Sequence, residues 1–485
     1  MRWGWMAAVP MVLASAVAVA QEPPVITPPS PAPAAAAPPL ALPAPEGLTP
    51  AQAETALKAL QAAHLHGLRP QDYLPADPED SAALMKGLLR YARDVKVGRL
   101  APADFPDLWA IRPAAYDPAP ELARALAEDR LQAWLDGLAP RYAGYVALKR
   151  GLVRYREIAA AGGWETIPAG PPMGLGSTDP RVPALRKRLA VEDPQTEATG
   201  SATFDQALQD AVVRAQKRYG LKPDGVVGPG TLAYLNQPVG QRVLQIIANM
   251  ERWRWLPATM PATRVQVNSG AAIVTLFRDD KPVLSMKAVS GKPGDETPML
   301  ISAIHSVVIN PPWNVPARIA REELWPKERA RPGYLAANGY RVIKVEGAEP
   351  RLQQKSGDSS ALGRFKFDFD NPFAVYLHDT PSKGGFDLYA RQASHGCVRI
   401  EKPRKLAEAL LAADPAWAAP EALDAALGDG SKTQRVRLAE PTPVMILYWT
   451  AFAGADGQMH FRSDPYNWDR LLLTKVGVVG QATKA

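Results

Sequence analysis

The sequence has 485 residues, of which 47% are hydrophobic and 22% are charged. This composition is typical of a globular protein, and the length predicts several domains, because a domain averages about 150 residues. The formal net charge is +7, but basic and acidic residues are interleaved along the chain, which argues against nucleic-acid binding. The single cysteine, Cys397, excludes an internal disulfide and a zinc site built on cysteine pairs.

The first 20 residues predict a cleaved signal peptide. Arg2 precedes an apolar stretch from Trp3 to Val19, and Ala18-Val19-Ala20 is the small-x-small pattern that signal peptidase cuts. The alternative is a membrane anchor, which is disfavoured because the stretch is short and contains Pro10. Residues 21–47, rich in proline and alanine, predict a disordered linker. We therefore expect an exported protein.

Helical periodicity begins at residue 48. Thr49, Pro50 and Gln52 form the capping-box pattern that starts a helix, and leucines follow on one face. Further stretches up to residue 170 repeat apolar residues at spacings of three and four, with Gly or Pro between them. We predict an α-helical scaffold domain over residues 48–170.

Residues 175–240 predict a small three-helix module. The pattern consists of two amphipathic helices, a loop rich in Gly, Pro and Asp, and a short third helix that opens near Pro229. Phe204, Gln216 and the loop from Asp224 to Thr231 resemble the three-helix peptidoglycan-binding module. The resemblance implies wall binding. The alternative is a spacer that packs on its neighbours and binds nothing.

The periodicity changes from helical to alternating at Thr263. Segments rich in β-branched residues predict a mainly β domain over residues 245–470, followed by a C-terminal tail over 471–485. A charged helical stretch and a polar loop interrupt the strands at 317–357, which predicts a helical capping insertion. The expected fold class is therefore multidomain α+β: a helical scaffold, a three-helix module and a mainly β catalytic domain.

A tryptophan pair precedes the first expected strand. Trp253 and Trp255 alternate with Arg252 and Arg254. This alternation predicts a domain joint in which the indoles pack and the guanidiniums stay in solvent.

Cys397 lies in a segment with the ingredients of a thiol nucleophile. A cysteine becomes reactive when a histidine takes its proton and when amide N–H groups face the developing oxyanion. His378 ends an apolar, strand-like run before the thiol, and Gly396 permits a tight backbone in which the Gly396 and Cys397 N–H groups converge. From these residues alone, a buried, inert thiol beside a structural histidine is the alternative. The predicted export favours the interpretation of Cys397 as a nucleophile over that of an inert thiol, because exported proteins with an odd cysteine usually keep it reactive.

The spacing of this segment resembles the catalytic signature of the L,D-transpeptidases. Fifteen residues separate His378 from the string Ser394-His395-Gly396-Cys397. Further segments are similar to the large Gram-negative branch of the family, and they are residues 249–257, 310–316, 361–367 and 376–381. That branch has a helical scaffold, a peptidoglycan-binding module and a capping insertion. Two features depart from it: Arg399 stands where many members have Asn, and the loop before Ala361 differs.

The resemblance implies a role for each residue of the site. Cys397 is the nucleophile, His378 is its base, and the backbone carbonyl of Asp379 orients the imidazole. The remaining residues expected to line the site or the oxyanion position are Tyr376, Ser394, His395, Gly396 and Arg399. For His395, a purely structural ring is the alternative to a role in positioning the oxyanion loop.

We expect no metal and no cofactor. The acidic residues near His378 are Asp368, Asp370 and Asp379. Strand alternation does not make their side chains converge as the ligands of a metal ion must.

The expected function is cell-wall crosslinking in the periplasm. The resemblance implies a 3→3 peptidoglycan crosslink, made through a Cys397 thioester with loss of D-Ala. Alternatives are an L,D-carboxypeptidase, a lipoprotein-anchoring transpeptidase and a non-catalytic wall-binding scaffold. The expected partners are donor and acceptor stem peptides, with β-lactams of the carbapenem type as inhibitors. A mild positive charge also suits a carboxylate-rich wall.

Overall fold

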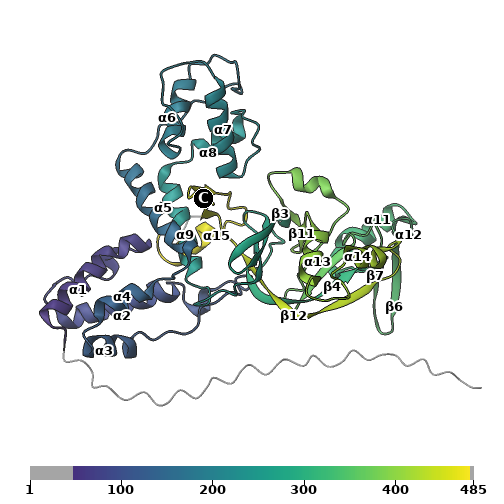
Figure 1. The fold of residues 1–485 in the computed structure, drawn as a ribbon, viewed down its shortest axis with the longest axis horizontal. Helices are drawn as coiled ribbons and strands as arrows, with labels where there is room; N and C mark the ends of the chain where they lie inside the picture. Colours follow the sequence, from purple (N-terminus) through teal and green to yellow (C-terminus); the bar gives the residue numbers. More distant parts are fainter. Residues whose placement is uncertain (1–46, 481–485) are drawn as a thin grey trace, which may run out of the picture. The chain divides into compact units, whose positions relative to one another are not determined.

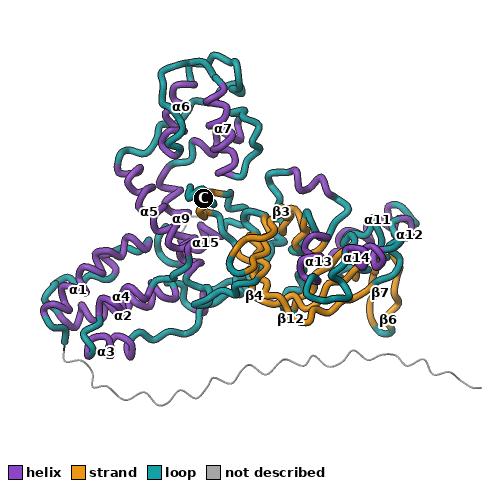
Figure 2. The backbone as a smooth tube through the Cα atoms, viewed as in Figure 1, coloured by secondary structure: helices purple, strands orange, loops and turns teal. Residues whose placement is uncertain are grey.

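The computed structural model describes residues 47–480. The predicted signal peptide and all but the last residue of the predicted linker lie outside the described residues. Within the described range, no helix is long and apolar enough to cross a membrane. Helices fill the part of the chain before residue 254, and the named strands follow it (Figures 1 and 2).

The N-terminal part is helical, as the periodicity predicts. Its helices are α1 (Pro50–Gln61), α2 (Ser81–Val97), α3 (Ala119–Ala127), α4 (Leu131–Leu138) and α5 (Ala143–Ala160), with short 3₁₀ turns at Ala62–His66, Pro70–Asp72 and Pro102–Asp104. The capping box is confirmed: the Gln52 N–H donates to Thr49 Oγ1 at 3.3 Å, and the Thr49 N–H donates to Gln52 Oε1 at 3.0 Å. The apolar faces of α1, α2, α3 and α4 share one core.

The next part contains the three short helices that the sequence predicts. They are α6 (Val182–Glu192), α7 (Gln206–Tyr219) and α8 (Pro229–Leu235). Gln216 of α7 fixes the loop that precedes α8, because its side chain accepts from the Gly225 N–H at 2.9 Å and donates to the Val226 carbonyl at 3.0 Å. The motif residues of this loop therefore have a structural role.

Helix α9 (Val239–Trp253) carries the tryptophan joint. The indoles are buried as predicted, and the Trp253 ring stacks on Trp449 with centroids 4.3 Å apart. The prediction of solvated guanidiniums is wrong, because Arg252 and Arg254 are both 2% exposed. Each is neutralised by a buried carboxylate, Arg252 by Asp469 at 2.5 Å and Arg254 by Glu251 at 2.7 Å. Burial of the arginines is possible only because those carboxylates accompany them.

A nine-stranded sheet follows α9. Its strands are β1 (Arg264–Asn268), β2 (Ile273–Arg278), β3 (Lys281–Gly291), β4 (Leu300–Ile309), β8 (Phe365–Phe369), β9 (Leu377–His378), β10 (Gln392–Ser394), β11 (Val398–Ile400) and β12 (Gln434–Leu447), in the order β10-β3-β11-β9-β8-β4-β12-β1-β2. Because β2 also pairs with β3, the sheet closes on itself around an apolar core. Most pairings are antiparallel, but β9 runs parallel to β11, β1 to β12 and β10 to β3.

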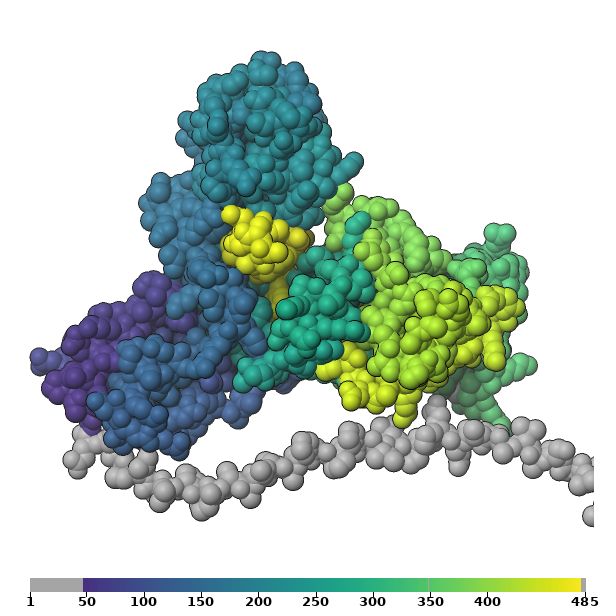
Figure 3. Space-filling view, in the orientation of Figure 1, coloured from purple at the N-terminus to yellow at the C-terminus, as the bar shows by residue number. Residues whose placement is uncertain are grey.

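Two helices cover this sheet. They are α13 (Pro403–Leu411) and α14 (Pro420–Leu427), whose buried residues Leu406, Leu411 and Leu423 belong to the same core as the strands. They form the light green surface of this domain in the space-filling view (Figure 3). A mainly β domain with covering helices, after a helical N-terminal region, confirms the multidomain α+β class.

The insertion is only half helical. It contains α10 (Ala317–Ile319), a π turn (Ala320–Leu324), α11 (Trp325–Ala330) and α12 (Tyr334–Ala337), and then the hairpin β6 (Tyr340–Val345) and β7 (Ala348–Gln354), which pairs with β5 (Trp313–Asn314). The prediction of a polar loop is wrong for this part of the insertion, which forms the hairpin. Gly347, with φ of +70°, allows the tight turn between the two strands.

The C-terminal part returns to the helical region. The hairpin β13 (Ala451–Ala453) and β14 (Met459–Phe461) precedes α15 (Trp468–Lys475). Residues 471–475, assigned from the sequence to a tail, belong to this helix. Leu472 and Leu473 are buried in the core that also contains α5, α7 and α9, so apolar contact holds the segment.

A buried ion cluster connects the N-terminal helices to α9. Glu251 is fully buried. Its Oε2 forms ion pairs with Arg99 Nε at 3.2 Å and with Arg254 Nη1 at 2.7 Å. We expect Glu251→Ala to lower the free energy of unfolding by about 3–5 kcal/mol, because two cations stay buried without their counter-charge. Urea unfolding measures this. Glu54→Ala, which breaks an exposed pair with Lys58, is the control and should leave unfolding unchanged. Equal losses of unfolding free energy in Glu251→Ala and Glu54→Ala would show that the buried ion cluster does not stabilise the fold.

Candidate active site

The parallel pairing of β9 with β11 brings the two key residues together. His378 is the register partner of Arg399, and the Val398 N–H donates to the Tyr376 carbonyl at 3.1 Å. Leu377 and Val398 are fully buried on the core side. Because side chains alternate along a strand, Tyr376 and His378 share the opposite face with Arg399 and with Cys397, which directly precedes β11.

The loop that carries Cys397 is held by hydrogen bonds of Gly396 and Ser394. Gly396 has φ of +108°, a conformation that an L side chain rarely adopts. Its N–H donates to Ser394 Oγ at 3.2 Å, and its carbonyl accepts from Thr297 Oγ1 at 2.8 Å. Ser394 Oγ also donates to the Cys397 carbonyl at 2.5 Å. Of the two N–H groups expected to converge on an oxyanion, the one of Gly396 is therefore already engaged by Ser394.

The Cys397 N–H takes part in no hydrogen bond among residues 47–480. It is therefore the one amide of the Gly396-Cys397 pair that stays free to donate to a bound carbonyl oxygen. The thiol itself is half-buried, and its Sγ lies 4.0 Å from the Ala374 carbonyl oxygen.

His378 is buried, and its orientation is fixed by the main chain. Its Nδ1 lies 2.5 Å from the Asp379 carbonyl oxygen, the contact that the resemblance implies, so Nε2 is left for the thiol. Burial, with a contribution from Arg399, lowers the pKa of His378 to about 3. No hydrogen bond joins the thiol to His378 within the described part of the chain. Catalytic hydrogen bonds are often long before a substrate binds.

The Asp379 carboxylate serves the backbone instead of the imidazole. It accepts from the Arg364 N–H at 2.8 Å and from the Thr380 N–H at 2.7 Å, and it pairs with Lys383. A Cβ on Gly363 would come within 2.4 Å of this carboxylate, so only glycine fits there. The segment around Gly363 thus fixes the turn that follows His378.

Tyr376 and Arg399 flank the thiol. The Tyr376 ring lies 5.6 Å from the His378 ring, and burial followed by the Cys397 thiol raises the pKa of its hydroxyl. Burial lowers the pKa of Arg399. Among the described residues, Arg399 has no ion-pair partner, and its buried Nε has no hydrogen-bond partner. A half-buried guanidinium without a counter-charge is costly, so it is suited to an anionic ligand.

His395 contacts the capping insertion. Its Nε2 lies 2.7 Å from Glu323 Oε1 in the π turn. Arg318 of α10 pairs with Asp295, which lies in the loop beside the nucleophile strand. No sequence pattern points to Glu323, Thr297 or Asp295, because their positions beside the site depend on long-range packing.

The other acidic residues singled out from the sequence do not converge on the site. Asp368 pairs with Arg435 at 2.6 Å and with Lys366 at 2.7 Å, and Asp370 lies 3.4 Å from His305 Nε2. Over residues 47–480, no three His, Cys, Asp or Glu side chains cluster as metal ligands do.

Six of the site residues line one cavity of about 1240 Å³: Tyr376, His378, Ser394, His395, Cys397 and Arg399. The insertion forms one wall and the ends of β9, β10 and β11 form another. Its charged lining residues are mainly cationic: Arg318, Arg321, Lys327, Arg329, Arg351 and Arg399, against Glu323 and Glu349. The cavity is therefore suited to a large ligand that carries several carboxylates.

Comparison with known proteins assigns the domain that contains this cavity. Residues 262–434 match the family described as L,D-transpeptidase catalytic domain. The chain therefore has the catalytic domain of the L,D-transpeptidases. Residues 44–152 match the Scaffold domain family, and residues 178–235 match the family described as "Putative peptidoglycan binding domain".

A curated relative supports the same family. A "Putative L,D-transpeptidase" of Haemophilus influenzae is 32% identical over 242 residues, which are 47% of this chain. The match spans about half of that relative, 48% of its length.

Solved structures of L,D-transpeptidases are also similar. One from Xylanimonas cellulosilytica is 18% identical and covers 57% of this chain and 98% of its own, with a TM-score of 0.19. The catalytic domain of the Enterococcus faecium enzyme acylated by ertapenem is 15% identical. The match covers 39% of this chain and 99% of that structure's chain, with a TM-score of 0.19. L,D-transpeptidase 3 of Mycobacterium tuberculosis, with a faropenem-derived adduct, is 15% identical. The match covers 39% of this chain and 60% of that structure's chain, with a TM-score of 0.20.

The protonation of the free site predicts how the thiol reacts with pH. Burial raises the pKa of Cys397, and with the pKa of His378 at about 3 the pair is thiol and neutral imidazole at pH 7. Iodoacetamide should therefore react more slowly with native protein at pH 8 than with the same thiol in urea-unfolded protein. The native rate should rise about tenfold per pH unit and still climb above pH 9. A plateau between pH 6 and pH 8 would instead indicate a thiolate–imidazolium pair.

Proposed function

We propose that the protein is an L,D-transpeptidase that makes 3→3 peptidoglycan crosslinks through a Cys397 thioester. The observation that carries the proposal is the shared strand face on which Cys397, His378 and Arg399 line one cationic cavity. The catalytic-domain match over 262–434 and the peptidoglycan-binding match over 178–235 support wall chemistry.

The first half-reaction acylates the enzyme. His378 Nε2 takes the proton of the Cys397 thiol as the sulfur attacks the carbonyl of the L-centre in a donor tetrapeptide stem. A carbon–sulfur bond forms, the peptide carbon–nitrogen bond breaks, and D-Ala leaves with the proton that His378 returns. The free N–H of Cys397 is positioned to donate to the carbonyl oxygen as negative charge develops on it.

The second half-reaction transfers the acyl group. The side-chain amine of a second stem attacks the thioester, His378 accepts the proton of that amine, and the new amide bond replaces the carbon–sulfur bond. The proton then returns to the sulfur. The neutral imidazole of the free site suits both steps, because it is ready to act as a base without first losing a proton.

Arg399 is proposed to bind the terminal carboxylate of the D-Ala that leaves. Arg399 and Cys397 share a strand face two positions apart, and the D-Ala carboxylate lies only a few bonds from the carbonyl under attack. A carboxylate there would supply the missing counter-charge of the guanidinium and place the scissile bond over the sulfur.

The remaining cations of the cavity are proposed to hold the acceptor stem. A volume of about 1240 Å³ exceeds the range of roughly 300–1,000 Å³ typical of small-molecule sites, which favours a substrate of two stems. This favours crosslinking over hydrolysis or lipoprotein attachment. On the basis of the signal-peptide pattern, the enzyme is proposed to act in the periplasm. Carbapenems are proposed to inhibit it by acylating Cys397.

The decisive experiment is a muropeptide profile. Purified protein is incubated with wall fragments that carry tetrapeptide stems, and the products are separated and weighed by mass spectrometry. New 3→3 dimers with release of D-Ala support the proposal. Release of D-Ala without dimers would mean a carboxypeptidase, and neither product would leave a wall-binding protein without this activity.

Cys397→Ala should abolish both dimer formation and D-Ala release, because no other thiol exists to form the thioester. The half-buried position predicts little change in thermal unfolding, which serves as the folding control. Turnover at the wild-type rate would refute the thioester route.

His378→Ala should lower the rate of donor acylation by about 10²–10⁴-fold, the usual contribution of a positioned general base. Acylation is followed as D-Ala release in a single turnover. His64→Ala, on an exposed histidine far away in the sequence, is the matched control and should keep the wild-type rate. An unchanged rate in His378→Ala would exclude this residue as the base.

Arg399→Gln should reduce kcat/KM for a tetrapeptide donor by about 10–100-fold, the value of a hydrogen bond to a charged group. With a donor whose terminal carboxylate is amidated, wild type and variant should become similar. Arg404→Gln, on the surface and paired with Glu408, controls for loss of charge. Equal effects of Arg399→Gln on both donors would show that this guanidinium does not bind the terminal carboxylate.

A further inference from the structure

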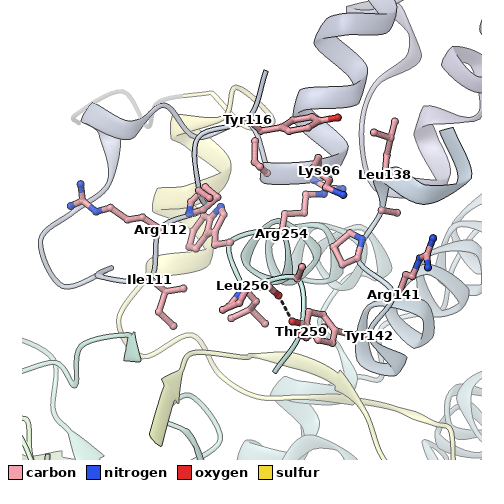
Figure 4. A pocket seen from close by; sticks show the side chains of 18 of the residues that line it. Lys96, Ile111, Arg112, Tyr116, Leu138, Arg141, Tyr142, Arg254, Leu256 and Thr259 are labelled. Carbon is pink, nitrogen blue, oxygen red and sulfur yellow. Dashed lines mark hydrogen bonds between the residues drawn. The ribbon is translucent and has the colours of Figure 1, made fainter. Parts of the chain in front are cut away.

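A second cavity lies away from the active site, and we call it the scaffold pocket. It has a volume of about 810 Å³ and is lined by the end of α2, residues 110–116, residues 137–142, residues 254–259 and Ile301 (Figure 4). It shares no lining residue with the catalytic cavity. It also lies outside residues 178–235, which match the peptidoglycan-binding family.

Every charged side chain that lines the scaffold pocket is a cation. Arg254 is neutralised by Glu251 at 2.7 Å. Lys96, Arg112 and Arg141 have no carboxylate partner within residues 47–480, and Figure 4 shows Arg112 and Arg141 on opposite sides of the cavity. Because no acidic residue lines the walls, the pocket attracts anions.

Rigid aromatic rings complete the walls. The Tyr116 hydroxyl donates to Glu121 Oε2 at 2.8 Å, and the Tyr142 hydroxyl donates to the Pro257 carbonyl, the dashed contact in Figure 4. Both hydroxyls are engaged, so the ring faces are held in place for a ligand. Ile301, 43% exposed, adds apolar surface at the edge. Because these rings are already held in place, they lose little conformational entropy when a ligand binds against them.

We propose that the scaffold pocket is a second peptidoglycan site, which binds the carboxylates of an uncrosslinked stem and the apolar face of a neighbouring sugar. The inference rests on the proposed function, because that function supplies a polymer in which carboxylates and sugar rings lie side by side. A concave pocket within the roughly 300–1,000 Å³ of small-ligand sites suits one repeating unit of this polymer. It suits an acidic segment of a protein less well, since that would be expected to use a larger, flatter surface.

Photolabelling tests the site by its position. The probe is the disaccharide-tetrapeptide repeating unit of the wall, carrying a photoreactive group, and the protein is the full chain with Cys397→Ser so that no turnover occurs. Residues 110–116 and 137–142 should be labelled. In Arg112→Gln/Arg141→Gln, half-maximal labelling of these segments should need at least about tenfold more probe, because two charge-assisted contacts are lost.

Two control variants separate charge from folding. Arg124→Gln/Arg150→Gln removes two exposed scaffold cations outside the pocket and should label like the parent protein. Arg112→Lys/Arg141→Lys keeps the charges and should restore most of the labelling, whereas a misfolded variant would not recover. Equal labelling in Arg112→Gln/Arg141→Gln and the parent would overturn the proposal.

A competition measurement identifies the occupant. Unlabelled disaccharide-tetrapeptide should displace the probe from the two segments, and poly-glutamate at the same carboxylate concentration should not. Stronger displacement by poly-glutamate would mean an acidic protein segment and would overturn the wall assignment. Since labelling needs no Cys397 chemistry, its outcome is independent of whether crosslinked dimers form, and the two proposals can fail separately.

Discussion

The site depends on the parallel pairing of two short strands. β9 and β11 each have only two or three residues, yet their pairing sets which side chains face the cavity. Because side chains alternate along a strand, a shift by one residue would turn His378 into the core and Leu377 into the cavity. The buried Leu377 and Val398 oppose such a shift, so the hydrophobic core and the chemistry are fixed by one constraint.

Burial gives the free site its electrostatic state. His378 loses its hydration and faces Arg399, so the neutral imidazole is favoured, and the thiol is kept protonated for the same reason. In the free site, Arg399 therefore carries a positive charge, while Cys397 and His378 are both uncharged. An arriving carboxylate would neutralise Arg399 and, in doing so, remove one of the charges that lower the pKa of His378. The charge of a bound ligand and the pKa of His378 are therefore coupled in this arrangement.

Ion pairs also link the catalytic domain to the parts around it. Glu323 and Arg318 connect the insertion to the loops beside Cys397, and the buried Arg252 and Arg254 at the end of α9 are matched to Asp469 and Glu251. In the scaffold pocket, Arg254 is matched to Glu251, whereas Lys96, Arg112 and Arg141 have no carboxylate partner within residues 47–480. These three cations and Arg399, which also lacks a carboxylate partner among the described residues, line the two cavities, where a carboxylate ligand would supply the missing counter-charge.

The sequence alone determined the order of the helical and mainly β parts and the residue types in the string from His378 to Cys397, because these depend on neighbouring residues. It did not determine the hairpin of the insertion, the burial of Arg252 and Arg254, or the engagement of the Gly396 N–H by Ser394. Those depend on partners that only folding brings close: Glu251 and Asp469 neutralise the arginines, and Thr297, 99 residues from Gly396, holds its carbonyl. Local pattern predicts which groups are present, and long-range packing decides which of them stay free to react.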